Sequence, residues 1–109
     1  MNDIEKSKHE FRQSSIWKKF RKFKFSESSK DFVTHKKLKS NSRLHHLDLN
    51  PDNYKDLSEP SHFENLNNET HKMVHYLYPL YRKDSEVLDR LKDLFDRMKE
   101  INSRLYLFQ

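Results

Sequence analysis

Apolar residues recur along the last part of the chain at alternating steps of three and four, from Phe63 to Phe108. This spacing is the period of a helix that supercoils with other helices. This series of fourteen positions is called the seam below. Twelve of the positions are apolar, and Thr70 and Asp84 are the exceptions. Four more apolar residues widen the face, namely Val74, Tyr81, Leu88 and Phe95. A face this wide favours a helix in a multi-helix bundle.

Local signals mark where this helix begins and where it is interrupted. Ser61 and Glu64 have the spacing of a capping box, which predicts a helix start at residue 61. Pro79 lies inside the pattern and cannot donate a helical hydrogen bond. The segment is therefore either one long helix kinked at Pro79 or two helices, about 62–78 and 84–108. The alternating steps of three and four residues continue in the same phase across Pro79, which favours the kinked helix.

The first half of the chain is basic and poor in apolar residues. Residues 1–50 contain 13 Lys and Arg against 6 Asp and Glu, whereas residues 51–109 contain 9 against 11. We expect residues 1–60 to form a mostly disordered basic arm with a short amphipathic helix at 14–25. The fold class expected is thus all-α, with a largely disordered N-terminal half and a coiled-coil or bundle helix over 61–109.

The arm has the composition of a segment that contacts an acidic surface. Cations alternate with large aromatic rings, a mixture that suits anionic lipid headgroups, acidic proteins or nucleic-acid phosphates. We place nucleic acid behind the other two. The residues predicted to make this contact are Trp17, Lys18, Lys19, Phe20, Arg21 and Lys22.

The composition also excludes several kinds of site. The chain contains no glycine and no cysteine, which removes glycine-rich phosphate loops, thiol nucleophiles, Cys-ligated metal sites and disulfides. No apolar run is long enough to span a bilayer, and the acidic N-terminus does not resemble a secretory signal. These absences favour an intracellular protein.

Two local patterns resemble metal sites, and neither is convincing in the sequence. Residues 48–59 place oxygen ligands at EF-hand spacing, but Asn53 stands where that loop needs glycine, so a turn followed by a polar linker is favoured. His71 and His75 are four residues apart on the expected helix, a zinc-chelating spacing, but both fall on its outer side. The pair His45 and His46 adds no useful spacing. We therefore predict no metal, no cofactor, no catalytic residue and no enzymatic activity.

The apolar seam needs a covering surface that the rest of the chain does not offer. We therefore predict helical partner subunits, either of a hetero-oligomer or of a homodimer. The interface predicted for these partners consists of Leu77, Leu80, Val87, Leu91, Leu94, Met98, Ile101 and Leu105.

Residues 91–105, LKDLFDRMKEINSRL, resemble the terminal helix of the KxDL family. The shared pattern is a leucine, an aliphatic–Phe pair, a basic residue, spaced aliphatics and a closing basic–Leu pair. The defining Lys-x-Asp-Leu motif departs here, because Lys92-Asp93-Leu94 lacks the intervening residue. The resemblance implies a small helical subunit of a complex that acts on lysosome-related organelles.

The function expected from the sequence is that of a non-enzymatic coiled-coil scaffold in a hetero-oligomeric complex, with a role in endolysosomal or vesicle trafficking. Its location would be cytoplasmic, peripheral on an organelle membrane. The alternative is a nuclear protein that associates with nucleic acid or chromatin and dimerises through its C-terminal helix.

Overall fold

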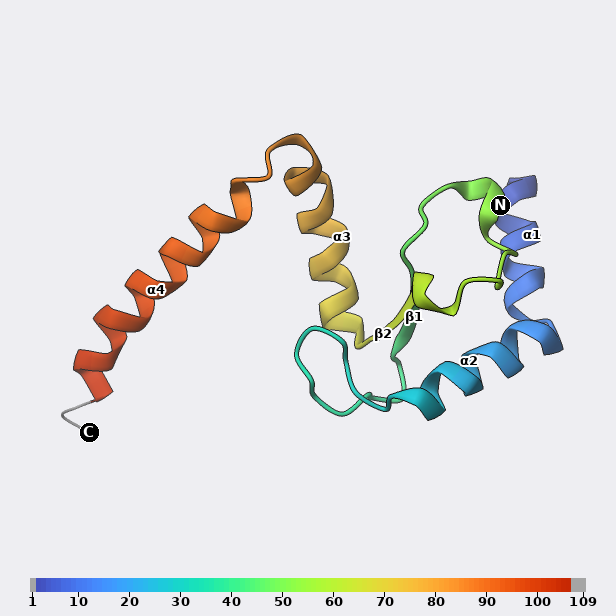
Figure 1. Cartoon of the computed structure of the whole chain (residues 1–109), viewed down its shortest axis with the longest axis horizontal. Helices are drawn as coiled ribbons and strands as arrows, with labels where there is room; N and C mark the ends of the chain where they lie inside the picture. The colour runs from blue at the N-terminus through green and yellow to red at the C-terminus, as the bar shows by residue number, and fades with distance from the viewer. Residues whose placement is uncertain (1, 107–109) are drawn as a thin grey trace. The chain divides into compact units, whose positions relative to one another are not determined.

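The computed structural model describes residues 2–106, with side chains through residue 103. Within this range the chain forms α1 (Asp3–Arg12), α2 (Ser15–Glu27), β1 (Arg43–His46), β2 (Phe63–Leu66), α3 (Asn68–Lys83) and α4 (Val87–Tyr106) (Figure 1). Two short 3-10 helices, η1 (Pro51–Asn53) and η2 (Pro60–His62), lie between the strands. The chain divides into two compact units, Met1–Lys72 and Met73–Gln109.

The first two helices begin at residues with capping side chains. Asn2 accepts a hydrogen bond from the backbone N–H of Glu5, and the Glu5 carboxylate accepts one in return from the N–H of Asn2. Ser14 accepts from the N–H of Trp17 and so starts α2. These bonds satisfy backbone donors that the first turn of a helix leaves without partners.

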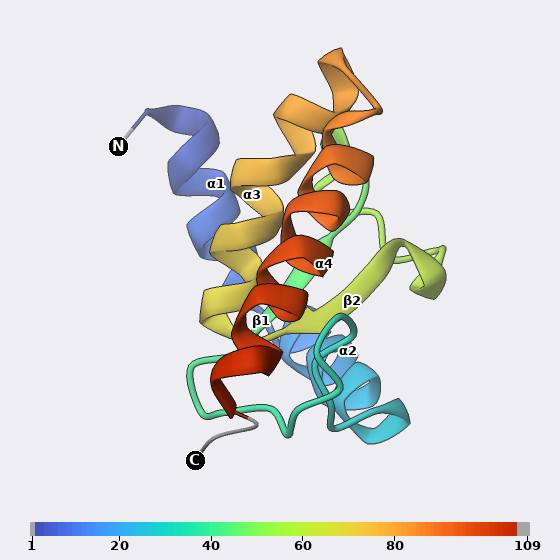
Figure 2. The ribbon, with the colours of Figure 1, turned by 90° about the vertical axis from the view of Figure 1, so that its left-hand side faces the viewer.

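An aromatic core joins α2 to the sheet. The strands β1 and β2 are antiparallel neighbours, with His45 opposite Glu64 and His46 opposite Phe63 (Figure 2). Phe63 is only 1% exposed. Its ring lies 4.8 Å from that of Phe20 and 6.1 Å from that of Trp17, centroid to centroid. The burial of these rings is the main apolar stabilisation of the first unit.

A buried carboxylate holds the loop between α2 and β1 against β2. Asp31 is 0% exposed and accepts hydrogen bonds from the backbone N–H groups of Val33, Thr34 and Asn67 at 2.8–2.9 Å. Burial alone would raise the pKa of Asp31, but these bonds, together with one from the Thr70 side chain, outweigh it and lower the pKa to about 2. Asp31 therefore remains charged and hydrogen-bonded in the folded chain.

Two buried asparagines extend the same polar interior. The Asn65 side-chain amide donates to the carbonyl of Lys24 at 3.1 Å, which attaches β2 to the end of α2. The Asn67 side chain donates to the carbonyl of Lys37 at 3.1 Å and accepts from the N–H of Lys39 at 2.8 Å. Side chains thus supply the hydrogen bonds that a longer sheet would obtain from its backbone.

The predicted fold class is wrong in its N-terminal half. This half is ordered and contains α1, α2 and β1 rather than a mostly disordered arm, and the fold is not all-α because β1 pairs with β2. The α2 helix occupies the segment where a short helix at 14–25 was expected. The order has a physical cause that composition does not reveal, because buried polar side chains replace the missing apolar ones.

The predicted helix start at Ser61 is also wrong. Residues 60–62 form η2, and Phe63 to Leu66 form β2, so the residues read as a capping box precede a strand. Phe63 and Leu66, assigned to the helical seam, are buried in the sheet instead. Pairing with β1 outweighs the local helical signal in this segment.

No long single C-terminal helix forms in the described residues, because α3 ends at Lys83 and α4 begins at Val87. The break is not at Pro79, which lies inside α3. Asp84 produces it, since its carboxylate accepts from the N–H of Glu86 at 3.1 Å and also pairs with Arg90. A residue that bonds to the backbone ahead of it favours the start of a new helix. None of the helices described is both long and apolar enough to cross a membrane.

Candidate metal centre

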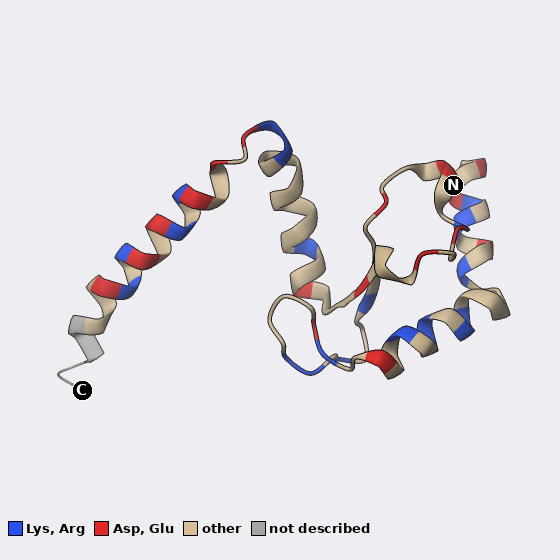
Figure 3. Cartoon of the chain, in the orientation of Figure 1, with Lys and Arg blue, Asp and Glu red and all other residues tan. Residues whose placement is uncertain are grey.

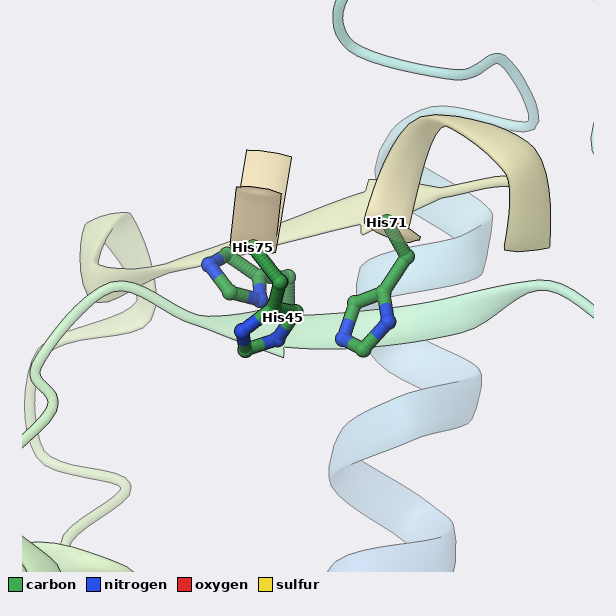
Figure 4. A group of neighbouring side chains, drawn as sticks. All are labelled: His45, His71 and His75. Carbon is green, nitrogen blue, oxygen red and sulfur yellow. The ribbon is translucent and has the colours of Figure 1, made fainter. Parts of the chain in front are cut away.

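Three histidine side chains gather at the junction of β1 and α3. Figure 4 shows His45 on the strand and His71 and His75 on successive turns of the helix, with their imidazole rings turned toward one another. One ring nitrogen from each lies within 4.8 Å of the others. His45 is buried, His71 is half-buried and His75 is exposed. The cluster therefore extends from the protein interior to solvent.

The chain brings these residues together in two steps. His71 and His75 are four residues apart on α3, so helical geometry alone puts them on one face. His45 joins them because β1 pairs with β2, and α3 begins two residues after β2 ends. The rings of His45 and His71 meet edge to face with their centroids 5.2 Å apart.

This donor set fits a divalent transition metal. Imidazole nitrogens bind Zn²⁺ at about 2.0–2.1 Å, so two ligands of a tetrahedral zinc lie roughly 3.4 Å apart. The separation of up to 4.8 Å in the cluster requires only a small closure of the rings. His75 is the exposed member of the cluster. Three protein ligands leave a fourth position for water or substrate, the pattern of catalytic zinc sites.

His46 follows His45 directly and occupies a different environment. Its ring stacks on that of Phe63, with the centroids 4.4 Å apart and the planes 16° from parallel. Burial lowers the pKa of His46, with a smaller opposing effect from the charge of Asp48. The stacking holds the imidazole in one orientation beside the cluster-bearing strand.

A hollow of about 410 Å³ lies next to the cluster in the first unit. His71 forms part of its wall, and so do three arginines, Arg12 from α1, Arg21 from α2 and Arg43 from β1. Trp17 supplies an aromatic surface.

The predicted acidic-surface residues all lie on α2, where Figure 3 shows blue Lys and Arg bands between tan positions. They separate into two groups. Trp17 and Phe20 are half-buried in the aromatic core and so are not free to enter a headgroup layer. Lys18, Lys19, Arg21 and Lys22 are exposed. The structure thus keeps the cations of the prediction on the surface and uses its aromatic rings in the core.

The loop with EF-hand spacing closes on itself. The Asp48 carboxylate accepts from the Asn53 side chain and from the N–H of Asn50, both at 2.8 Å. The bond from Asn53 is the main reason that the pKa of Asp48 is lowered. These bonds form an Asx turn that leads into η1.

The predicted partner interface divides between two helices. Leu77 and Leu80 lie on α3. The remaining six residues, Val87, Leu91, Leu94, Met98, Ile101 and Leu105, lie on α4. The Leu105 side chain is outside the described residues, and Leu94, Met98 and Ile101 are exposed.

Sequence reasoning did not find the complete histidine cluster, because His45 has no helical spacing to His71 or His75. One available signal was the pair of short segments RLHH and FENL, whose pairing would have placed His45 near the start of α3. Comparison with protein-family models, with curated proteins and with solved structures gives no match for this chain. Its function must therefore be argued from the geometry.

Proposed function

We propose that this protein is a metal-dependent hydrolase that cleaves phosphodiester bonds of nucleic acid. The observation that carries the proposal is the convergence of His45, His71 and His75 on one point, with a position left over for a water or a substrate oxygen. The proposal departs from the expectation of a non-enzymatic protein, which rested on the lack of a recognisable site in the sequence.

The histidines would hold Zn²⁺ or a similar ion. When bound, such an ion lowers the pKa of a coordinated water and polarises a phosphoryl oxygen. His45 fixes the position of the ion because it is buried, while His75 at the surface leaves the site accessible. A structural zinc site is normally closed by a fourth protein ligand. Within the described residues, the cluster contains three.

The charge distribution supports a polyanionic substrate. Residues 1–50 carry 13 Lys and Arg against 6 Asp and Glu. Three of these cations, Arg12, Arg21 and Arg43, line the hollow that His71 also lines, so a phosphate entering there would meet positive charge. Neutralising phosphates with Lys and Arg is the main source of affinity for nucleic acid. This feature also favours the nucleic-acid alternative drawn from the sequence.

His46 follows His45 in β1 but does not face the cluster. Successive side chains of a strand point to opposite faces, and the His46 ring stacks on Phe63 on the α2 side of the sheet. His46 is therefore placed neither to hold the ion nor to take a proton from a water bound to it.

The test measures metal content and cleavage separately. The purified chain is loaded with Zn²⁺, Mn²⁺ or Mg²⁺, its metal content is measured, and nicking of supercoiled plasmid DNA is followed with and without EDTA. We expect His45→Ala to lose both the metal and the activity. His46→Ala should keep both, because its side chain lies on the other face of β1, against Phe63.

His62→Ala is the matched control, because it removes an exposed histidine that is not part of the cluster. It should change neither readout. One bound metal in the wild type without metal-dependent cleavage of DNA or RNA would reject the hydrolase and leave a structural metal site. Cleavage that His45→Ala does not alter would show that a contaminant or another site is responsible.

A second function has separate support, namely docking of α4 on a helical partner protein. The apolar face of α4 includes Leu88, Leu94, Phe95, Met98 and Ile101, all exposed. On a helical projection this face is bordered by Arg90 and Arg97 on one side and by Lys92 and Lys99 on the other. The acids Asp89, Asp93, Asp96 and Glu100 lie on the opposite side of the helix.

The two cationic borders indicate the chemistry of the partner. A second copy of α4, in either orientation, would place cations against cations across the interface. A helix of another protein with Asp and Glu on both sides of its apolar seam would pair with both borders. The spacing of three and four residues favours a helix over a lipid surface, because a flat surface does not require a heptad period.

A synthetic helical peptide with a leucine seam and glutamate flanks serves as the probe for this function. It should bind the full chain, and a version with lysine flanks should not. Arg90→Glu/Arg97→Glu should weaken binding roughly tenfold, because each reversed charge replaces a weak attraction by a repulsion. Arg82→Glu/Lys83→Glu makes the same change of net charge on α3 and should have little effect. Binding to phosphatidylglycerol vesicles but not to the peptide would favour a membrane instead, and concentration-dependent dimers would favour a second copy.

A further inference from the structure

The hollow beside the histidine cluster has the size and lining of a binding site for an anionic ligand. Its volume of about 410 Å³ is within the range of small-molecule sites, about 300–1,000 Å³. Its three arginines come from three separate elements: Arg12 at the end of α1, Arg21 in α2 and Arg43 at the start of β1. The fold, rather than a local run of basic residues, brings these guanidinium groups together.

The three arginines have few anionic partners of their own. Arg21 donates to the backbone carbonyl of Ser42 at 3.0 Å, which fixes its guanidinium near Arg43. Among the described side chains, no carboxylate lies within salt-bridge distance of Arg12, Arg21 or Arg43. All three side chains are exposed, and an anion in the hollow would gain charge-assisted hydrogen bonds from them. Guanidinium groups bind phosphate oxygens in a bidentate manner, so phosphate is the anion best matched.

The position of the hollow connects it to the metal centre. His71 forms part of both the wall of the hollow and the histidine cluster. A phosphate held by the arginines would therefore lie next to the point where the three imidazoles converge. In a polynucleotide, neighbouring phosphates are joined through one sugar, so one phosphate in the hollow would position the next one along the strand.

We propose that this hollow is a phosphate subsite for a polynucleotide strand, adjacent to the phosphodiester that is hydrolysed at the histidine cluster. The assignment of a neighbouring scissile bond rests on the proposed hydrolase function. The exposed cations Lys18 and Lys22 lie on α2 beside Arg21 and would contact the strand where it continues beyond the hollow. A free mononucleotide or inorganic phosphate would engage the arginines but not this extended surface.

The test compares binding by two variants that remove the same number of charges. Arg12→Gln/Arg21→Gln/Arg43→Gln removes the subsite, and Arg82→Gln/Lys83→Gln/Lys99→Gln removes three cations from α3 and α4. Both are assayed with EDTA present, so that metal-dependent cleavage is suppressed, and gels confirm that the DNA stays intact. Binding of a dye-labelled DNA duplex is measured by anisotropy over a range of salt concentrations.

We expect the subsite variant to flatten the plot of log affinity against log salt by about one unit per arginine. The control variant should change the slope by less than one unit. Trp17 is the single tryptophan of the chain and lines the hollow, so its fluorescence reports occupancy directly. DNA should change that signal in the control variant and not in the subsite variant.

Equal slopes for the two variants would overturn the proposal. AMP or inorganic phosphate is titrated in the same way as DNA. If either one changes the Trp17 fluorescence at the same phosphate concentration as DNA does, the ligand of the hollow is a free nucleotide or phosphate and not a polynucleotide. If the triple variant fails to fold by circular dichroism, Arg43→Gln alone is used and should reduce the slope by about one unit. The binding result does not depend on catalysis. If the subsite variant shows a reduced salt slope but the wild type never cleaves DNA, the phosphate subsite stands and the hydrolase function is rejected.

Discussion

The two units of the chain solve the problem of a small core in opposite ways. In Met1–Lys72, polar side chains enter the interior, and Asp31, Asn65 and Asn67 hold the loops and the sheet by hydrogen bonds. In Met73–Gln109, the described polar and charged side chains stay outside, and the described apolar residues of α4 are largely exposed as well. The unit with the weaker hydrophobic pattern is therefore the one with the buried core.

This difference shows that a count of apolar residues measures core formation poorly in so short a chain. Phe63 is 1% exposed in the polar-rich unit, while Ile101 is 64% exposed in the unit with the regular apolar pattern. The first unit is held by few apolar groups and many specific polar contacts. In the described part of the second unit, the helices carry large apolar side chains that are exposed.

The largest expected effect concerns the centre of the aromatic core. Phe63→Ala should lower the free energy of unfolding by about 3–5 kcal/mol, because it removes a buried ring and leaves a cavity among Phe20, Trp17 and His46. Urea unfolding followed by Trp17 fluorescence measures this directly. Phe95→Ala, which removes the same side chain from an exposed position on α4, is the matched control and should cost much less. Similar losses for both variants would mean that the contrast between the units does not exist in solution.

Metal binding at the histidine cluster should have the next largest effect on stability. With free Zn²⁺ at 100 times its dissociation constant, the free energy of unfolding should rise by about 2.7 kcal/mol, since the ligands assemble only in the folded state. Denaturant unfolding with zinc and with EDTA gives the difference. Hydrogen exchange should show protection in β1 and the first turns of α3, with little change in α4. An equal gain in His45→Ala would show that zinc binds elsewhere.

Acid should act on the first unit through Asp31. The unfolded chain takes up this proton near the ordinary pKa of 3.8, whereas in the folded chain the pKa is about 2. The carboxylate therefore contributes stability above pH 3.8 that is lost as the pH falls toward 2, and the amount is about 2 kcal/mol. The difference in unfolding free energy between the wild type and Asp31→Asn, measured between pH 5 and 2, isolates this contribution. A constant difference over that range would show that Asp31 is not selectively stabilised as a carboxylate.

The same contrast explains which parts of the structure the sequence could reveal. The apolar period of residues 87–106 indicates a helix, and α4 is one. The strands could not be found in this way, because β1 and β2 have four residues each and include the buried polar residues His45 and Asn65. The heptad also continued through Phe63 and Leu66, where pairing with β1 overrides the helical period. The metal centre depends on that pairing, so two of its ligands were visible as a spacing and the third was not.

The smallest expected effect is the most direct test of the second unit. Ile101→Ser should change the free energy of unfolding of the isolated chain by no more than about 0.5 kcal/mol, because the side chain is 64% exposed and has little burial to lose. Thermal unfolding at two widely separated protein concentrations measures the effect and reveals any self-association. A loss several times larger would mean that another surface already covers α4 in solution. If that loss grew with protein concentration, the cover would be a second copy, and the argument from the cationic borders of α4 would be wrong.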